Sequence, residues 1–255
     1  MDFNNINSII TGGGSGLGLA TAKLIIENGG KVIALDLEKK NVDAGILSNK
    51  NFYFISNDVS NEQNTKENIE NAFNKFKCIS LVVNCAGIGF PSKVINKDGI
   101  PHSGELFKKI IDVNLIGTFN VLKFAAERML KNKFDKDGFR GLIINTASIA
   151  AFDGQIGQAA YSASKGGIVG ITLPIARELA KYGIRVCTIA PGLFETPMLK
   201  GLPDKAHQSL IDSTLYPKRL GKPSEYAKLV KSIYENNMLN GETIRLDGAL
   251  RLAPK

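Results

Sequence analysis

A run of glycines between an apolar strand and a helix constrains this chain more than any other feature. Residues Ile6–Ile10 are short, apolar and largely β-branched, which favours a buried strand. The segment TGGGSGLG (Thr11–Gly18) follows, and helical periodicity begins at Ala20. Small residues at a helix start let backbone N–H groups approach a pyrophosphate at the positive helix end. This order predicts dinucleotide binding, although a glycine cluster alone also fits an ordinary tight turn. The candidate residues are Gly12, Gly16 and Gly18.

Strands and helices alternate from one end of the chain to the other, with no linker, composition break or internal repeat. Such alternation is typical of a parallel sheet covered by helices on both faces. We therefore predict one α/β domain over residues 1–255, a doubly wound Rossmann fold of about seven parallel strands, with the ligand at their carboxyl ends. The predicted strands after the first are Lys31–Leu35, Phe52–Ser56, Leu81–Val83, Leu142–Asn145, Arg185–Ile189 and Glu242–Leu246; the later helices are Asn61–Lys77, Leu106–Lys133, Ala159–Lys181 (with a kink or irregular turn at Pro174) and Ser224–Asn237.

The net charge of +8 comes from scattered lysines, which favours solubility and also attracts anionic ligands such as nucleotides, coenzyme A thioesters or RNA. No basic run with interleaved aromatics occurs, so nucleic acid is not expected to be the main partner. The three cysteines form no CxxC pair, which indicates reduced thiols inside a cell. His102 and His207 stand apart from any cysteine or acidic cluster, so no metal site is expected.

No apolar run approaches the roughly 20 residues that a membrane-spanning helix needs. The first residues, MDFNNINSII, lack a basic n-region and an amphipathic leader, so no cleavable targeting peptide is evident. The protein is therefore expected to stay where it is made, unless a presequence is atypical or already removed.

Asp36 closes the second predicted strand, at the distance past the glycines where an acidic residue binds the adenosine ribose hydroxyls. A carboxylate there repels a 2′-phosphate, which favours NAD over NADP. Lys39 and Lys40 weigh the other way, because a flexible cation can pair with a phosphate. The alternative is that Asp36 is an ordinary surface residue at a strand end.

Tyr161 and Lys165 lie four residues apart in a predicted helix, so they share one face. A free tyrosine has a pKa near 10, and acid–base work near neutral pH requires lowering it by roughly 3 units, or about 4 kcal/mol. A neighbouring ammonium and a positive nicotinamide ring can supply that field in a dry site. The alternative is that the pair only packs at the surface.

Together these motifs resemble the short-chain dehydrogenase/reductase family, and the resemblance covers the whole chain. One departure is NCAG, where the family usually has NNAG; because this element works mainly through its backbone, little is expected to change. The matching segments are TGGGSGLG (Thr11–Gly18), Asp36, Asp58-Val59, NCAG (Asn84–Gly87), Asn114, Ser148, YSASK (Tyr161–Lys165) and PGLFET (Pro191–Thr196).

The resemblance implies a role for each motif. Tyr161 is the general base in oxidation and the general acid in reduction, Ser148 positions the substrate oxygen, and Asn114 holds a water that relays the proton. Val59 and Cys85 also fit as core residues, and Thr196 as a helix cap. For the NAD cofactor, the resemblance implies Ser15 and Leu17 at the pyrophosphate, Asp58 and Val59 at the adenine, Cys85, Ala86 and Gly87 at the adenosine ribose, Lys165 at the nicotinamide ribose, and Phe194 and Thr196, following Pro191, at the carboxamide.

A narrower resemblance is to the type-2 short-chain 3-hydroxyacyl-CoA dehydrogenases, carried by residues 144–180, 189–199 and 240–251. It implies an acyl-CoA substrate in fatty-acid or branched-chain acyl oxidation, with Gln155 beside the substrate oxygen. It also implies that Leu193–Leu220 forms a lid over the acyl chain, with basic residues near the coenzyme A phosphates. Gln155 equally fits a water-exposed loop residue. Animal members also oxidise hydroxysteroids and are mitochondrial homotetramers, so we expect a homotetramer in the cytoplasm or the mitochondrial matrix.

Other functions remain open on this scaffold. One is a steroid, sugar or other secondary-alcohol dehydrogenase. Another is a 3-oxoacyl-carrier-protein reductase, which normally prefers NADPH, so that Asp36 argues against it. A third is a dinucleotide-binding scaffold subunit, as some relatives serve in RNA-processing assemblies. Intact Ser148, Tyr161 and Lys165 favour catalysis. Chain-length preference and reaction direction are left open.

Overall fold

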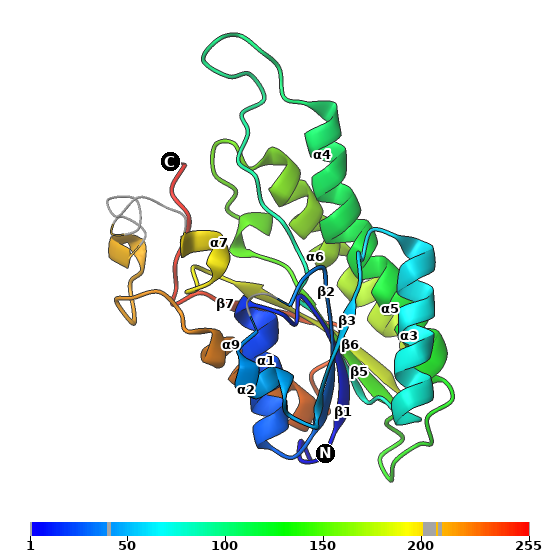
Figure 1. Cartoon of the computed structure of the whole chain (residues 1–255). Coiled ribbons are helices and arrows are strands. Elements are labelled where there is room, and N and C mark those ends of the chain that lie inside the picture. Colours follow the sequence, from blue (N-terminus) through cyan, green and yellow to red (C-terminus); the bar gives the residue numbers. More distant parts are fainter. Residues whose placement is uncertain (1, 40–41, 201–207, 209–210, 255) are drawn as a thin grey trace.

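The computed structural model describes residues 2–39, 42–200, 208 and 211–254. Its centre is a parallel sheet of seven strands in the order β3-β2-β1-β4-β5-β6-β7 (Figure 1). The predicted α/β Rossmann fold is thereby confirmed, with strand ends within two residues of the predicted ones. The strands are β1 (Asn7–Thr11), β2 (Lys31–Asp36), β3 (Phe52–Ser56), β4 (Leu81–Asn84), β5 (Gly141–Thr146), β6 (Ile184–Pro191) and β7 (Thr243–Leu246).

Helices cover both faces of the sheet (Figure 1). α1 packs against α9 on one face, and α3 packs against α5 on the other, with α4 against α6. Two short helices lie in connecting segments: α2 between β2 and β3, and α7 after β6. The bounds are α1 (Gly16–Glu27), α2 (Ala44–Leu47), α3 (Glu62–Phe76), α4 (Gly104–Ile111), α5 (Gly117–Met129), α6 (Ala159–Ala180), α7 (Pro197–Lys200) and α9 (Pro223–Glu235).

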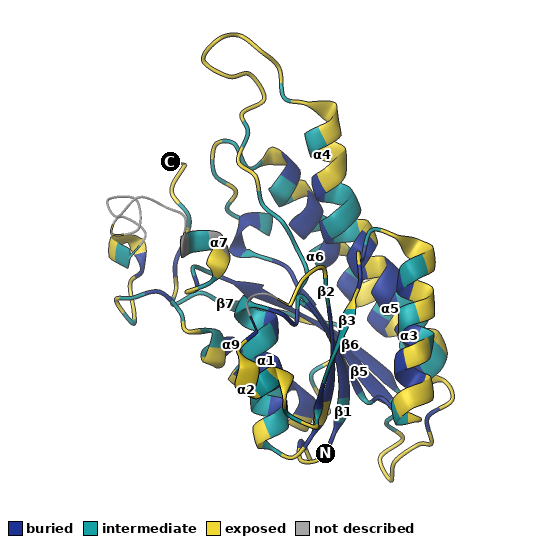
Figure 2. Cartoon of the chain, in the orientation of Figure 1, coloured by how far each residue is buried: buried dark blue, intermediate teal, exposed yellow. Residues whose placement is uncertain are grey.

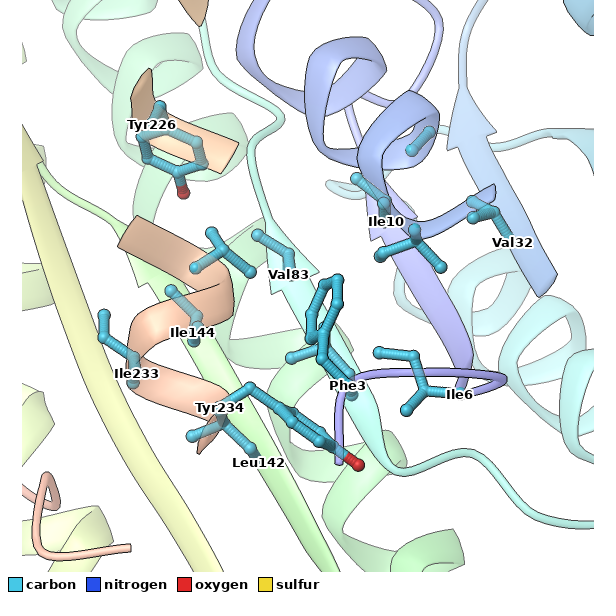
Figure 3. Close-up of a cluster of buried hydrophobic side chains, with 14 of the residues drawn as sticks. Phe3, Ile6, Ile10, Val32, Val83, Leu142, Ile144, Tyr226, Ile233 and Tyr234 are labelled. Atoms are coloured by element: carbon cyan, nitrogen blue, oxygen red, sulfur yellow. The ribbon is translucent and has the colours of Figure 1, made fainter. Parts of the chain in front are cut away.

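The strands are buried from both sides because their side chains alternate between two apolar clusters. On β1, Ile10 joins the cluster that faces α1 and α9, and Ile9 joins the cluster that faces α3 and α5. Val83 and Val82 divide in the same way on β4. Figure 2 shows the strands as the buried centre of the molecule, and Figure 3 shows the first cluster. The near-continuous apolar strands of the sequence therefore form two cores rather than one.

The predicted helix Leu106–Lys133 is divided in the structure. α4 ends at Ile111, a π-helical turn (η1) spans Asp112–Ile116, and α5 begins at Gly117. Asn114 lies at the centre of η1, and its amide hydrogen-bonds to the backbone of Ile88 outside the helix. π-turns are rare and are often found at functional sites.

Two other expectations about irregular segments have different outcomes. α6 continues through Pro174 without an irregular turn; the helical bond lost at Pro174 concerns Gly170, and both residues are exposed to water. The predicted loop Gly89–Gly104 is a loop as far as Ser103, and Gly104 begins α4. An isolated bridge between Ile95 and Pro101 brings its two halves together as a hairpin-like arm (Figure 1). We call residues 88–103 the arm.

Candidate active site

The glycine turn joins β1 to α1 so closely that side chains are excluded. Gly12 has φ +63° and Gly16 has φ +49°, both in the left-handed region that favours glycine. A Cβ on Gly18 would lie 2.3 Å from the carbonyl oxygen of Gly12. The turn is therefore tight, and it places the first N–H groups of α1, which lack intrahelical partners, at the end of the sheet. The side chain of Ser15, the N-cap, makes no capping hydrogen bond.

Gly18→Ala is expected to lower the free energy of unfolding by about 2–3 kcal/mol, because the added methyl group meets backbone that cannot move aside. Gly170→Ala is the matched control: a Cβ there meets nothing within 4 Å on an exposed helix position, and it is expected to raise stability by about 0.5–1 kcal/mol. Urea denaturation of both variants measures the difference. Equal stability of the two would contradict the tight packing of the turn.

Asp36 is fixed against this turn. Its carboxylate accepts hydrogen bonds from the backbone N–H of Gly14 at 2.9 Å and of Leu37 at 2.8 Å. A Cβ on Gly14 would lie 2.9 Å from Asp36 Oδ2. The end of β2 thus places one partly buried carboxylate beside the glycine turn, where sequence spacing predicted it.

The end of β4 lies on the other side of the turn. Thr11 Oγ1 accepts from the N–H groups of Cys85 and Ala86, each at 3.1 Å. A Cβ on Gly12 would lie 2.8 Å from Ala86 N. Thr11 holds β1 and β4 together at the point where the strand order reverses, which is where open α/β sheets bind ligands. Sequence reasoning placed Thr11 in the motif without giving it this role.

The remaining predicted cofactor residues divide into accessible and core positions. Asp58 is exposed and bonds to Ser60, whereas Val59 is buried and packs against the Gly117 position. Thr196 lies near Gly16, whose Cβ would be 3.4 Å from the threonine methyl group.

The segment that follows β6 is also partly in the core. Pro191 ends β6 and is buried. The Phe194 ring is buried against Gly221, where a Cβ would lie 2.8 Å from it. Backbone rather than the Phe194 side chain is therefore the part of this segment open to a ligand. The predicted lid Leu193–Leu220 includes residues 201–207, 209 and 210, which lie outside the described residues.

Three side chains of the predicted acid–base group come from β5 and α6. Ser148 follows β5 and caps the short 3₁₀ helix η2 (Ile149–Ala151), its hydroxyl accepting from Ala150 N at 3.1 Å. Tyr161 and Lys165 lie one turn apart near the start of α6, with the Lys165 ammonium 5.8 Å from the centre of the Tyr161 ring. Lys165 is 4% exposed and donates to the carbonyl of Thr146 at 2.7 Å.

Burial is the largest cause of the pKa shifts of Tyr161 and Lys165. It raises the pKa of Tyr161 above its usual value, and a hydrogen bond with Ser148 opposes the rise. The chain alone therefore does not lower the pKa of this tyrosine. The predicted lowering also needs the positive nicotinamide ring beside Lys165, and it stays a prediction. Burial also lowers the pKa of Lys165 to about 8, and the Cys85 thiol acts in the opposite direction.

Asn114 is fully buried and holds two segments together. Its Nδ2 donates to Ile88 O at 2.9 Å and to Ser164 Oγ at 3.0 Å, and its Oδ1 accepts from Ile88 N at 2.8 Å. The side chain thus ties η1 to α6 and to the start of the arm. Its backbone carbonyl accepts from Thr118 Oγ1 at 2.7 Å.

A buried polar cluster lies beneath Lys165, and sequence reasoning missed most of it. Thr146 Oγ1 lies 2.8 Å from the hydroxyl of Tyr226, and the Cys85 sulfur lies 3.6 Å from both oxygens. Burial raises the pKa values of Tyr226 and Cys85, so the cluster is neutral. Tyr226 comes from α9, 80 positions after Thr146, so no local pattern could have revealed the contact.

Gln155 lies on the loop between η2 and α6, and its contacts are with the end of the chain. Its Nε2 donates to the carbonyl of Ala253 at 3.0 Å, and its N–H donates to Gln158 Oε1 at 3.0 Å. The residue is partly exposed. Its described hydrogen bonds do not include Ser148 or Tyr161, and it is joined to them through the chain of the loop itself.

The residues around the turn fit a dinucleotide. The glycines of the turn carry no side chains that would cover the free N–H groups at the start of α1. The helix dipole there favours an anion such as a pyrophosphate. The Asp36 carboxylate lies beside the turn at the end of β2. Figure 1 shows these segments meeting at one edge of the sheet.

Comparison with known proteins agrees with this geometry. The short chain dehydrogenase family model matches residues 7–207. The chain belongs to the short-chain dehydrogenase family. It is 52% identical to 3-hydroxyacyl-CoA dehydrogenase type-2 of Drosophila melanogaster over 99% of this chain and 100% of that one. It is 53% identical to the protein of that name from Homo sapiens, over 97% and 95%.

A solved structure supports the same assignment. The crystal structure of 3-hydroxyacyl-CoA dehydrogenase type-2 from Mycobacterium avium superposes with a TM-score of 0.92 at 37% identity, covering 98% of each chain. The resemblance to short-chain dehydrogenases is thereby confirmed. As a member of this family, the protein is a dehydrogenase that uses a nicotinamide dinucleotide and a small-molecule substrate. Among its described helices, none has the length and apolar character needed to cross a membrane.

Proposed function

We propose that this short-chain dehydrogenase oxidises 3-hydroxyacyl-CoA with NAD⁺ to 3-oxoacyl-CoA, NADH and a proton. The observation that carries the proposal is the group of Ser148, Tyr161 and Lys165 at the carboxyl edge of the sheet, in a chain about half of whose residues match relatives of that name. The substrate class rests on the names of those relatives, and the chemistry rests on the site.

The three side chains divide the reaction between them. The Ser148 hydroxyl donates to the substrate oxygen and holds it at the Tyr161 phenol, which takes the hydroxyl proton in oxidation and returns it in reduction. Lys165 lies in the same dry site and stabilises the phenolate that forms. The bound dinucleotide supplies the carbon that accepts the hydride. The proton then leaves through a water held at Asn114, which is the role that the resemblance to the family implies for this residue.

The cofactor contacts follow from the same edge. Residues of the glycine turn, Gly12 to Gly18, would hold the pyrophosphate through their N–H groups, and Lys165 would bind the nicotinamide ribose. Asp36 favours NAD over NADP, because its fixed carboxylate can accept from ribose hydroxyls and repels a 2′-phosphate. The resemblance assigns the adenine, the adenosine ribose and the carboxamide of the cofactor to the segments after β3, β4 and β6, and these contacts are part of the same proposal.

A homotetramer is consistent with apolar side chains left at the surface of the helices. Ile116 and Phe119 lie one turn apart and are 44% and 42% exposed, and Leu173 on α6 is 43% exposed. Covering such residues is favourable by about 25 cal/mol per Å² of apolar surface. Light scattering at micromolar concentration would show a four-chain mass.

An intracellular location, in the cytoplasm or the mitochondrial matrix, stays a prediction.

The test is a spectrophotometric assay of NADH oxidation with acetoacetyl-CoA, free acetoacetate and longer 3-oxoacyl-CoA thioesters, repeated with NADPH. We expect kcat/KM for the thioester to exceed that for the free acid by at least about tenfold, or about 1.4 kcal/mol, and NADH to be preferred. Equal efficiency on both substrates would overturn the acyl-CoA proposal. Activity only on steroids, or a preference for carrier-protein thioesters with NADPH, would favour the alternatives named above.

A further inference from the structure

The loop that joins the two halves of the acid–base group is held from outside by distant segments. Residues Phe152–Gln158 connect η2, whose N-cap is Ser148, to α6, whose first turns carry Tyr161. The loop bears Gln155 and two exposed apolar side chains, Phe152 at 48% and Ile156 at 50%. In the proposed function, the loop therefore joins the residue that positions the substrate oxygen to the residue that exchanges its proton.

Arg245, on β7, makes the strongest outside contacts with the loop. Its Nη2 donates to Asp153 Oδ2 at 2.6 Å and to the carbonyl of Leu250 at 3.0 Å, and its Nε donates to Asp247 Oδ2 at 2.7 Å. The guanidinium lies 5.1 Å from the centre of the Phe152 ring. The side chains of Arg245 and Asp153 are 21% and 23% exposed, so the pair is screened from water more than a surface pair is.

The end of the chain is held by the same arginine and returns to the same loop. After the Leu250 contact, the carbonyl of Ala253 accepts from Gln155 Nε2 at 3.0 Å, and the carbonyl of Pro254 accepts from Ile156 N at 3.0 Å. The loop, the end of β7 and the last residues of the chain thus form one hydrogen-bonded unit. The arm contacts the loop from another side, with Ser92 N donating to Gly157 O at 2.8 Å.

We propose that Arg245 is a positioning residue for the acyl-CoA substrate: it fixes the Phe152–Gln158 loop and the C-terminal residues against each other, and so presents the Gln155 carboxamide and the apolar side chains of Phe152 and Ile156 to the acyl part of the substrate. This inference rests on the proposed function. Arg245 acts through the loop and does not touch the reacting atoms.

The geometry separates this role from cofactor binding. The described contacts of Arg245 are with Phe152, Asp153, Asp247 and Leu250, and none is with the glycine turn or with Asp36. A variant that loosens the loop is therefore expected to raise KM for the acyl-CoA and to leave KM for NADH unchanged.

Arg245→Met removes both ion pairs of this side chain, with Asp153 and with Asp247, and keeps much of its length. We expect KM for acetoacetyl-CoA to rise about tenfold, the loss of one or two charged hydrogen bonds, with KM for NADH within about twofold of its original value. Arg245→Lys is expected to recover part of the loss, since it restores the charge without the forked geometry. The effect should increase with acyl chain length if the loop presents Phe152 and Ile156 to the chain.

Arg128→Met is the matched control. Arg128 pairs with Glu70 between α5 and α3 and has a side-chain exposure of 17%, and it is remote from the loop in sequence and by its contacts. It is expected to lower the melting temperature without changing KM for the thioester. A truncation after Leu252 gives a second test, because it removes the carbonyls that hold Gln155 and Ile156 but retains the Arg245–Asp153 pair; it is expected to raise KM for acetoacetyl-CoA as well.

The outcomes are distinct. If Arg245→Met and the truncation both leave KM for the thioester unchanged, the positioning role is wrong. A rise in KM shared equally by Arg128→Met would show a general loss of stability instead, and would also overturn it. If the unaltered protein reduces no 3-oxoacyl-CoA, the proposed function has failed, and the same variants measured on whichever alcohol or ketone it does accept decide whether Arg245 positions that substrate.

Discussion

Tyr161→Phe is expected to reduce kcat for acetoacetyl-CoA by about 10³-fold, because it removes the hydroxyl that we propose exchanges a proton with the substrate oxygen, and positioned acid–base catalysis contributes roughly 10²–10⁴-fold. The ring and its packing are retained, so folding and dinucleotide binding should change little. Stopped-flow or steady-state NADH absorbance measures kcat, and quenching of protein fluorescence on titration with NADH measures binding.

Tyr182→Phe serves as the control for this experiment. Tyr182 lies two residues after the end of α6 and is partly buried, and its ring lies 4.9 Å from the Lys181 ammonium. Removing its hydroxyl should leave kcat within about twofold, because its described contacts do not include Ser148, Tyr161 or Lys165. If Tyr161→Phe retained more than a tenth of the activity, the phenol would not be the proton donor. A biological function that survived this substitution would point to the scaffold alternative.

Asp36→Ser is expected to reverse the cofactor preference. The carboxylate that accepts from Gly14 and Leu37 is lost, and with it both the acceptor for the ribose hydroxyls and the repulsion of a 2′-phosphate. Hydrogen bonds to charged groups contribute about 1.5–3 kcal/mol each, so KM for NADH should rise by about 10- to 100-fold. The same substitution should lower KM for NADPH. The ratio of kcat/KM with NADH to kcat/KM with NADPH, compared between the original protein and the variant, measures the change in preference.

Asp43→Asn provides a comparison at another carboxylate in the segment between β2 and β3. Asp43 pairs with Lys23 and caps α2, and it makes no contact with the glycine turn among the described bonds. Its removal changes the charge by one unit, as Asp36→Ser does. An equal shift in cofactor preference would mean that net charge, rather than the placement of Asp36, selects NAD.

The fold could be predicted closely because its signals are short-range. Apolar runs of four to eight residues mark the strands, and each was found within two residues of its predicted ends. The i,i+4 spacing of Tyr161 and Lys165 places both near the start of α6, and the glycine turn precedes α1. The family resemblance added the order of these motifs. None of these inferences requires knowing which strand lies beside which.

Errors arose where a local pattern was overridden by a distant contact. The stripe of apolar residues in Leu106–Lys133 reads as one helix, but the bonds from Asn114 to Ile88 accompany a π-turn there. Burial by the surrounding elements raises the pKa of Tyr161, an effect that the spacing of Tyr161 and Lys165 did not reveal. Sequence spacing carries no measure of how much water a folded site excludes.

By itself, the sequence determined the class of fold, the two positions of the acid–base pair and the acid at the end of the second strand, because helix and strand periods act over a few residues. Only the tertiary structure decided what surrounds them. Asp153 and Arg245 are 92 positions apart, and Thr146 and Tyr226 are 80 apart. Such pairs meet because a parallel sheet brings the carboxyl ends of all its strands to one edge. The glycine turn illustrates both: its residues predicted a dinucleotide site, and the packing of Gly12 against Ala86 showed why no larger residue fits there.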